Sequence, residues 1–357
     1  MRHRTKELTR AGALFAVIAT LLAVPALSAS GMSKGVGMVR PVVRPAVRPA
    51  PRPALAAPLA ALTGTDIWMC AVDGGSATMP DGVVVPFWAF VEDTNLGAAG
   101  GCAAPALPGP LLDLAQGPDV TVHLTNQIPG QRVSIVFEGQ AGVPDRTGVT
   151  TGNTATYVVK ATDPGTYLYE AGTDVTRQVP MGLSGAMIVR PTTPGQAYAD
   201  PTTAFNMESV LVLSEIDPAL NANPAAFNPL NYDPEYFLIN GRAWDPAPTA
   251  TNPVISAAVG DRVLLRYVNA GSEHHTMMLL GTRETFIAKD AFPIRYPYSL
   301  TSETIPTGST ADAIVTVPAV PSGTRFPLFN RNMELTNGAF PNPANSPGGM
   351  MTFIQVP

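Results

Sequence analysis

Histidine, cysteine and charged residues are scarce in this sequence. The 357 residues include four His and two Cys, and charged residues make up only 14% of the chain. Imidazole and thiolate are the side chains that bind copper and similar metals best. With so few of these side chains, the protein cannot contain many such metal sites.

Several patterns typical of enzymes are also missing. The sequence has no Gly-x-Ser-x-Gly elbow and no glycine-rich phosphate loop, and its Asp and Glu are too scattered to indicate a glycosidase pair. These absences argue against a hydrolase. No window longer than a few residues has apolar side chains at helical spacing, so we expect little helix.

Turn-forming and apolar residues are abundant instead. The chain has 32 Gly and 37 Pro, and 45% of its residues are hydrophobic. Short runs of β-branched and aromatic residues lie between Gly and Pro clusters, for example Asp66–Val72, Gly82–Phe90 and Asp119–Asn126. This spacing predicts an all-β protein built from β-sandwiches.

The N-terminal region has two distinct parts. Basic residues precede an uncharged run from Ala11 to Leu27 and the small residues Ser28–Ser30, which predicts a signal peptide over 1–30 and hence export to the periplasm, cell surface or medium. In 31–62, Arg-Pro recurs every four residues from Arg40 to Pro53. We expect a disordered tether that is a solvated spacer or contacts an anionic surface.

The remaining chain is acidic. Thr63 to Pro357 contains 13 Lys or Arg and 26 Asp or Glu, so binding to nucleic acid is not expected. Both cysteines, Cys70 and Cys102, lie in this part. In an exported protein such a pair predicts one disulfide, with a copper thiolate as the alternative.

A weak internal repeat divides this part of the chain in two. The segment Gly117–Asn126 resembles Gly260–Asn269, and two further pairs follow in the same order: 164–169 with 322–328, and 182–189 with 348–354. Two copies of one β unit are implied. We place the domains at 63–192 and 204–357, with a linker in the Pro-rich stretch between Arg190 and Thr203.

The same segments resemble the multicopper oxidases. The resemblance extends from about Ile67 to the C-terminus, and its specificity comes from the combination of motifs. These motifs are Pro108–Leu112, Ser134–Gln140, Tyr167–Gly172, Gln178, Gly182–Gly185, Leu238–Gly241 and Asn269–Gly271. The resemblance implies two tandem cupredoxin-like Greek-key sandwiches and an oxidoreductase that depends on copper.

The copper ligands of that family are largely missing. The two His-x-His pairs of the first repeat fall on Val136 with Glu138 and on Glu170 with Gly172. The His-Pro-x-His-x-His-Gly motif falls on 275–281 and keeps only His275, and the His-Cys-His motif falls on 329–331, with Asn330 at the cysteine position. Three histidines beyond the signal peptide cannot supply the usual ten. The resemblance places the blue-copper cysteine well after Cys70 and Cys102, which leaves the disulfide.

The residues that remain at or near the ligand positions predict two candidate metal sites. His274, His275 and Met278 offer imidazole and thioether ligands for one copper ion, although successive strand residues point to opposite faces. Glu138 and Glu170, expected to converge with His275, would give a carboxylate site for another metal. In the alternative interpretation these carboxylates face solvent or pair with Arg177 or Arg331. His123, in an alternating strand, is expected to be structural.

Three functions follow from this pattern. The first is a non-catalytic cupredoxin module that holds no cofactor and binds an unidentified protein or surface, alone or as a homo-oligomer. The second is an oxidoreductase with a reduced or rebuilt metal site. The third is a copper carrier that uses His274, His275 and the methionines, with copper at low occupancy or in a site unlike that of the family.

Overall fold

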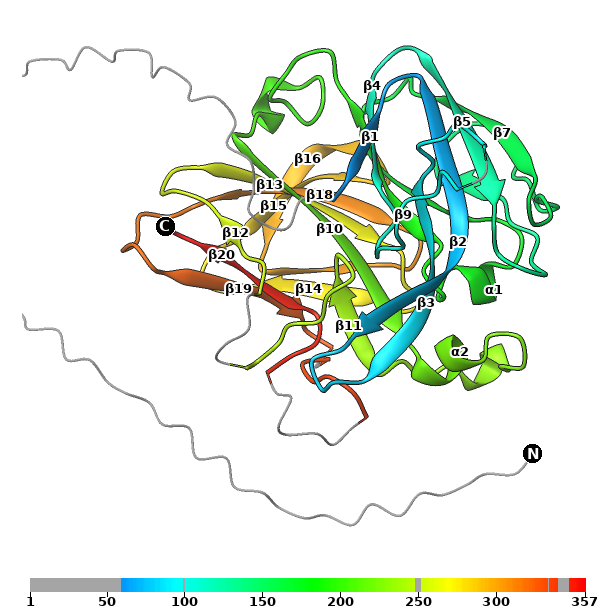
Figure 1. Cartoon of the computed structure of the whole chain (residues 1–357). Coiled ribbons are helices and arrows are strands. Elements are labelled where there is room, and N and C mark those ends of the chain that lie inside the picture. Colours follow the sequence, from blue (N-terminus) through cyan, green and yellow to red (C-terminus); the bar gives the residue numbers. More distant parts are fainter. Residues whose placement is uncertain (1–58, 99, 248–251, 333, 340–346) are drawn as a thin grey trace, which may run out of the picture. The chain divides into compact units, whose positions relative to one another are not determined.

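The computed structural model describes residues 59–357 except 99, 248–251, 333 and 340–346. The expected signal peptide and all but the last four residues of the expected tether lie outside the described residues. The described chain is nearly all β, as predicted, and forms two sandwiches of two sheets each (Figure 1). No helix in these described ranges is long and apolar enough to cross a membrane.

The first sandwich pairs a four-stranded sheet, β3-β2-β5-β7, with a five-stranded sheet, β1-β4-β9-β8-β6. The predicted strands over 66–72, 82–90 and 119–126 correspond to β2, β3 and β5. The bounds are β1 Ala61–Thr63, β2 Asp66–Thr78, β3 Val84–Glu92, β4 Leu111–Ala115, β5 Asp119–Asn126, β6 Ile135–Phe137, β7 Thr154–Lys160, β8 Gly165–Ala171 and β9 Ser184–Arg190.

The second sandwich pairs a six-stranded sheet, β11-β10-β13-β18-β15-β16, with a five-stranded sheet, β12-β20-β19-β14-β17. The bounds are β10 Met207–Ile216, β11 Tyr236–Ile239, β12 Ile255–Ser256, β13 Arg262–Asn269, β14 His275–Leu279, β15 Glu284–Lys289, β16 Phe292–Leu300, β17 Ser302–Ile305, β18 Thr310–Thr316, β19 Arg325–Asn330 and β20 Met351–Gln355.

Helix is confined to short connections, as the lack of helical periodicity predicted. The described helices are α1 Val175–Gln178, α2 Pro218–Ala222, η1 Pro201–Thr203 and η2 Pro229–Asn231. Three of them begin with proline directly after an Asp or Asn whose side chain accepts a backbone N–H, which is a favourable start for a helix.

The internal repeat is confirmed by the strand pairing. β5 lies parallel to β2 and antiparallel to β7, and its counterpart β13 lies parallel to β10 and antiparallel to β18. The pair β8 and β9 matches the pair β19 and β20, and β6 matches β14. Similar sequence segments therefore occupy equivalent places in the two sandwiches.

Strand alternation gives each sandwich its own core and a shared interface. In β9, Met187 and Val189 face the first core, whereas Ala186 and Ile188 pack against Val212 and Val268 of the second sandwich. The five-stranded sheet of the first sandwich therefore lies against the six-stranded sheet of the second. At the edge of this interface the backbone of Gly165 is so close to Ala291 that an added Cβ would lie 2.4 Å from the Ala291 Cβ.

Both ends of the first domain are more ordered than the sequence suggested. β1 begins at Ala61 and pairs with β4, and Leu62 packs against the first core, so the domain starts before Thr63. The expected linker contains Ala197 and Tyr198, which are buried against the six-stranded sheet. Apolar side chains hold both segments where proline content indicated free chain.

Candidate functional site

The first residue of β14, His275, lies on the core side of its sheet. Side chains of β14 alternate, so His275, Met277 and Leu279 are buried while Thr276 and Met278 are not. The imidazole of His275 is completely inaccessible to solvent. A buried imidazole needs partners for both nitrogens, and it has them.

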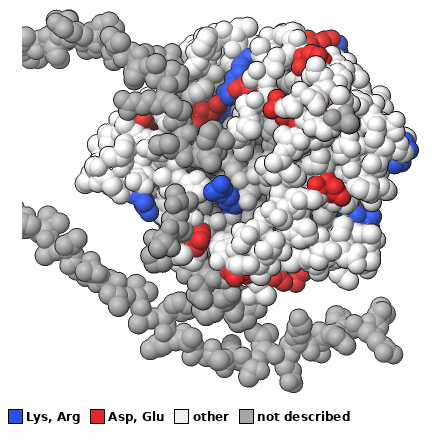
Figure 2. Space-filling model, viewed as in Figure 1, with Lys and Arg blue, Asp and Glu red and all other residues white. Residues whose placement is uncertain are grey.

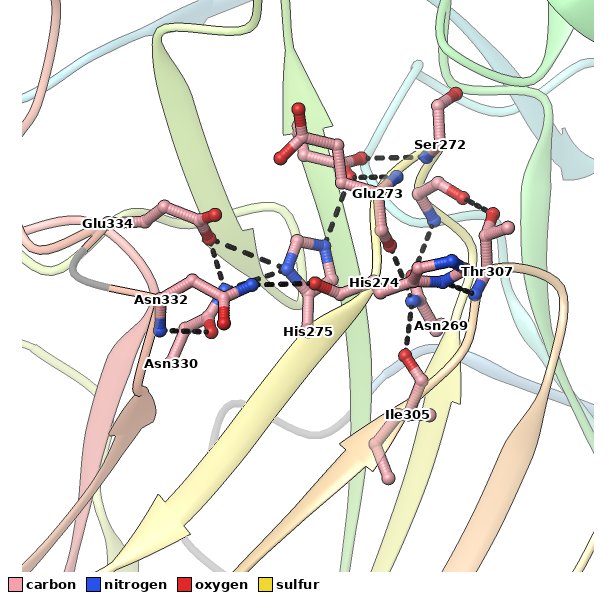
Figure 3. A network of polar contacts seen from close by, with 12 residues as sticks. Asn269, Ser272, Glu273, His274, His275, Ile305, Thr307, Asn330, Asn332 and Glu334 are labelled. Atoms are coloured by element: carbon pink, nitrogen blue, oxygen red, sulfur yellow. Dashed lines mark hydrogen bonds and ion pairs between the residues drawn. The ribbon is translucent and has the colours of Figure 1, made fainter.

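Three side chains surround the ring of His275 (Figure 3). The Nε2 atom lies 3.0 Å from Oε1 of Glu215, which is in β10. The Nδ1 atom lies 2.8 Å from Nδ2 of Asn330 and 3.5 Å from Oε2 of Glu334. The two carboxylates therefore approach opposite nitrogens of the same ring, and no ion could contact both carboxylates and the ring together.

Backbone hydrogen bonds fix the orientation of Asn330. Its Oδ1 atom accepts the N–H groups of Thr276, at 3.2 Å, and Asn332, at 3.1 Å. The amide nitrogen must then face the other way, toward His275 and Glu334. It donates to Glu334, and it donates to Nδ1 of His275 when that nitrogen carries no proton. Pairing of β14 with β19 brings Asn330 close to His275.

The loop before β14 is built around Glu215. Its carboxylate accepts the backbone N–H groups of Ser272, at 3.1 Å, and Glu273, at 2.8 Å. Asn269 donates to the carbonyl oxygens of Glu273 and Ile305, which holds the other side of the loop (Figure 3). This buried carboxylate is thus satisfied by the loop and by His275.

The charges around the ring determine its protonation. Burial lowers the pKa of His275, but the hydrogen bonds and negative charges of Glu215 and Glu334 outweigh burial and raise the pKa to about 9. The carboxylates therefore favour the protonated ring, and protonation at Nδ1 replaces the hydrogen bond donated by Asn330 with the contact to Glu334, because a protonated ring nitrogen cannot accept. Binding a metal there would require loss of a proton and of a carboxylate partner.

The two former ligand carboxylates of the first sandwich lie elsewhere. Val136 pairs with Glu170, and the burial of Ile135 and Phe137 in the first core leaves Val136, Glu138 and Glu170 on the opposite face. Burial, followed by the charge of Glu138, raises the pKa of Glu170 to about 7. The expected convergence with His275 does not occur, because His275 contacts Glu215 and Glu334 inside the second sandwich.

The proposed copper ligands around His275 are also separated. Met278 lies on the face of β14 opposite to His275, and His274 is exposed before the strand, where its Nδ1 accepts the N–H of Thr307 at 3.1 Å. Within the ranges given above there is no group of three or more His, Cys, Asp or Glu side chains arranged to hold a metal ion.

The remaining sequence candidates have structural roles. Cys70 and Cys102 form the predicted disulfide between β2 and the segment after β3. His123 stacks on Trp68 with ring centroids 4.0 Å apart, and its ring nitrogens contact Asp66 and Thr156. Arg177 pairs with Asp174 rather than with Glu138 or Glu170.

Glu215 and Glu334 were not predicted from the sequence as partners of His275. Glu215 had a detectable signal, because it lies among apolar residues near the end of β10, where a charged residue needs a buried partner. Glu334 stands in an irregular segment after β19 and gave no such signal.

Comparison with known proteins supports the resemblance. A family model described as multicopper oxidase matches residues 102–194. Laccase-15 of Oryza sativa subsp. japonica is 28% identical over 240 residues, which cover 61% of this chain and 38% of the laccase. The chain therefore spans well under half the length of this relative.

Solved structures share the fold. The blue copper oxidase from Nitrosomonas europaea has a TM-score of 0.67 at 23% identity, covering 82% of this chain and 85% of that chain. A copper nitrite reductase from the same organism has a TM-score of 0.65 at 20% identity, covering 83% of this chain and 94% of the reductase chain. The sandwiches are thus cupredoxin-like, and the family model and the laccase match show that part of the chain is similar to the multicopper oxidases.

Proposed function

We propose that this protein is an exported cupredoxin module that binds a partner or serves as a structural unit and does not catalyse copper-dependent oxidation. The observation that carries the proposal is the contact between His275 and Asn330. Both residues fall at copper-ligand positions of the family, and they bind each other and Glu334 instead of facing an open metal position.

The chemistry of these side chains supports the proposal. A blue copper centre depends on a thiolate, and the amide of Asn330 is neither anionic nor soft. His275 is the imidazole at the third ligand motif, and its two nitrogens face Glu215 on one side and Asn330 and Glu334 on the other. Electron transfer through this position would need a different set of side chains.

An oxidoreductase with a rebuilt metal site is the competing function. The observation in its favour is the proximity of Glu138 to Glu170, since two carboxylates can bind a hard cation. It lacks a third ligand in the part of the chain described here. A copper carrier is supported less well, because His274, His275 and Met278 point in different directions.

Export and surface contact belong to the same proposal. The basic N-terminus and uncharged run predict secretion, and the Arg-Pro repeat provides basic residues at regular spacing. On the face shown in Figure 2, Lys and Arg side chains are few and separated. We therefore propose that contact with an anionic surface depends on the Arg-Pro repeat rather than on this face, which can be tested by sedimentation with anionic and neutral vesicles. Sedimentation velocity of the same preparation would test self-association.

The decisive experiment measures metal and activity together. The mature protein is purified without added metal, incubated separately with copper, iron and manganese, freed of excess ions, and analysed for metal content and blue-copper absorption. We expect less than one tenth of an equivalent of any metal, and oxidation of phenols or ferrous iron no faster than with free copper. One equivalent of metal or protein-dependent oxidation would contradict the proposal.

Two variants identify the site if metal is found. Metal lost in Glu170→Gln would indicate the carboxylate pair, and metal lost in His274→Ala/His275→Ala would indicate the carrier. Glu92→Gln, which removes an exposed carboxylate in β3, is the matched control.

A further inference from the structure

A cleft of about 590 Å³ lies at the junction of the two sandwiches, away from His275. One wall is the turn between β2 and β3, from Ala77 to Gly82, and the other consists of Gly241–Asp245 after β11 together with Asn252 and Pro253. This volume is in the range of small-molecule sites. The hydrogen bond from the Tyr236 hydroxyl to Asp81, at 3.0 Å, ties the two walls together.

The guanidinium of Arg242 lines this cleft without a partner. Arg242 is exposed, and its side chain has no hydrogen bond or ion pair to any residue in the described ranges. The other charged residue of the lining, Asp245, accepts the N–H of Ala247 at 2.8 Å. Asn252 is also engaged, since it binds the backbone N–H and carbonyl of Asp245.

A rigid turn positions Arg242. Asn240 and Gly241 have φ values of 52° and 72°, and the backbones of Ile239 and Arg242 are hydrogen-bonded to each other, as in a type I′ hairpin turn. The Asn240 side chain binds Val210 and Val212 of β10. Gly241 admits no side chain, because a Cβ would lie 2.3 Å from the Leu107 carbonyl oxygen.

A small apolar cavity adjoins the cleft. It measures about 30 Å³ and shares Arg242, Ala243, Asn252 and Pro253 with the cleft. Its other lining residues are mainly apolar: Leu211, Ile239, Trp244 and Met351, with Asn240 and Thr352. Trp244 is held by a backbone bond to Gly349 and by ring contact with Phe353, with centroids 4.8 Å apart. A cavity of this size exceeds the roughly 10–15 Å³ needed for one water and admits the end of an alkyl chain.

We infer that this cleft binds a short aliphatic carboxylate. The carboxylate pairs with Arg242, whose planar guanidinium fits a carboxylate through two parallel hydrogen bonds, and the alkyl end enters the cavity beside Trp244. The site uses none of the former copper-ligand positions. Binding of the carboxylate is therefore independent of whether the protein binds metal.

The probes are hexanoate, hexylamine, hexanol and acetate. Their binding is measured by calorimetry and by NMR of the Trp side-chain N–H groups. Hexanoate is expected to bind and to shift a Trp signal, whereas hexylamine and hexanol are not. Arg242→Gln should weaken hexanoate about tenfold or more, and Arg283→Gln, which removes an exposed charge outside the cleft, should leave it unchanged.

A second variant tests the apolar end separately. Ala243→Leu narrows the passage between the cleft and the cavity and leaves Arg242 in place. The affinity for hexanoate should then fall to the affinity for acetate. Thermal unfolding establishes that each variant is folded. The inference is overturned if hexanoate does not bind the full-length mature protein, if Arg242→Gln binds it as tightly, or if hexylamine binds equally well.

Discussion

The amide nitrogen of Asn330 lies 2.8 Å from Nδ1 of His275, although the two residues are 55 positions apart in the chain. β14 and β19 are neighbours in one sheet, and Met277 pairs with Asn330 in their register. In the family pattern these positions would provide a histidine and a cysteine to copper. Here they form part of a hydrogen-bonded core, which has measurable consequences.

Replacement of His275 should change how stability depends on pH. The folded-state pKa of about 9 lies above the unfolded value of about 6.5, so the protonated ring stabilises the fold fully below pH 6.5 and loses this effect as pH rises through 9. This contribution is at most on the order of 3 kcal/mol. Urea unfolding of the wild type and His275→Gln should therefore show a difference that shrinks between pH 6 and pH 9.5.

The control for this experiment is His274→Gln, which alters an exposed neighbour. It should leave the pH dependence unchanged. A difference between the wild type and His275→Gln that stays constant with pH would contradict the protonated state of the buried ring.

Glu170 should likewise make stability fall as pH rises, but in a lower pH range. Its folded-state pKa of about 7 lies above its ordinary value of 4.5, so the folded protein holds a proton that the unfolded chain releases, and stability falls as pH rises from 4.5 through 7. Glu170→Gln should be close to neutral at pH 4.5 and stabilising by about 1–2 kcal/mol at pH 8. Urea unfolding at both pH values measures this change.

Glu138→Gln should produce a smaller gain at pH 8, since the charge of Glu138 is the second cause of the shift in Glu170. Equal stability of the wild type and Glu170→Gln at pH 8 would contradict the raised pKa of Glu170.

The interface between the sandwiches should depend on Asp312. Its carboxylate accepts from Thr166 of the first sandwich at 2.7 Å, from Tyr198 at 2.6 Å and from the fully buried Arg266 at 2.9 Å. Asp312→Ala leaves the Arg266 charge buried and without this partner, so we expect a loss of about 3–5 kcal/mol in the free energy of unfolding.

The matched control is Asp119→Ala, which removes the carboxylate of an exposed pair with Lys160 and should cost less than about 1 kcal/mol. Similar losses in the two variants would refute the importance of the buried pair. Denaturant unfolding followed by tryptophan fluorescence is suitable for both.

The disulfide should contribute to stability through the loop that it closes. Cys70 and Cys102 are separated by 32 positions, for which chain entropy gives a stabilisation of about 4 kcal/mol. The variant Cys70→Ala/Cys102→Ala should unfold at lower urea concentration, and adding reductant should move the wild type toward the same midpoint. If the unfolding midpoint of the wild type did not change although its thiols were fully reduced, the disulfide would not contribute to stability.

Much of the fold was readable from local pattern. The alternation in Asp119–Asn126 and Arg262–Asn269 predicted strands, and the similarity of these segments predicted two equivalent sandwiches. The predictions of free chain in the Pro-rich segments were wrong, because apolar side chains there pack against the sheets. Leu62 and Tyr198 lie in Pro-rich segments, yet each buries an apolar side chain against a sheet.

The candidate site was less predictable, because its partners come from distant strands. His275 and Asn330 were identified as ligand positions by resemblance, but nothing local indicated that Glu215 and Glu334 would face opposite nitrogens of the ring. The convergence of Glu138, Glu170 and His275 was expected from the family and did not occur. Strand alternation puts the two glutamates on the interface side of one sheet and His275 inside another sandwich.

The sequence by itself determined the all-β class, the two repeats, the disulfide pair and the scarcity of copper-binding side chains, because each of these depends on composition or on spacing along the chain. The tertiary structure decided which side chains meet. Hydrogen-bond partners and charge at His275, and the unpaired guanidinium of Arg242 in its cleft, depend on the register and packing of strands far apart in sequence, which no local pattern encodes.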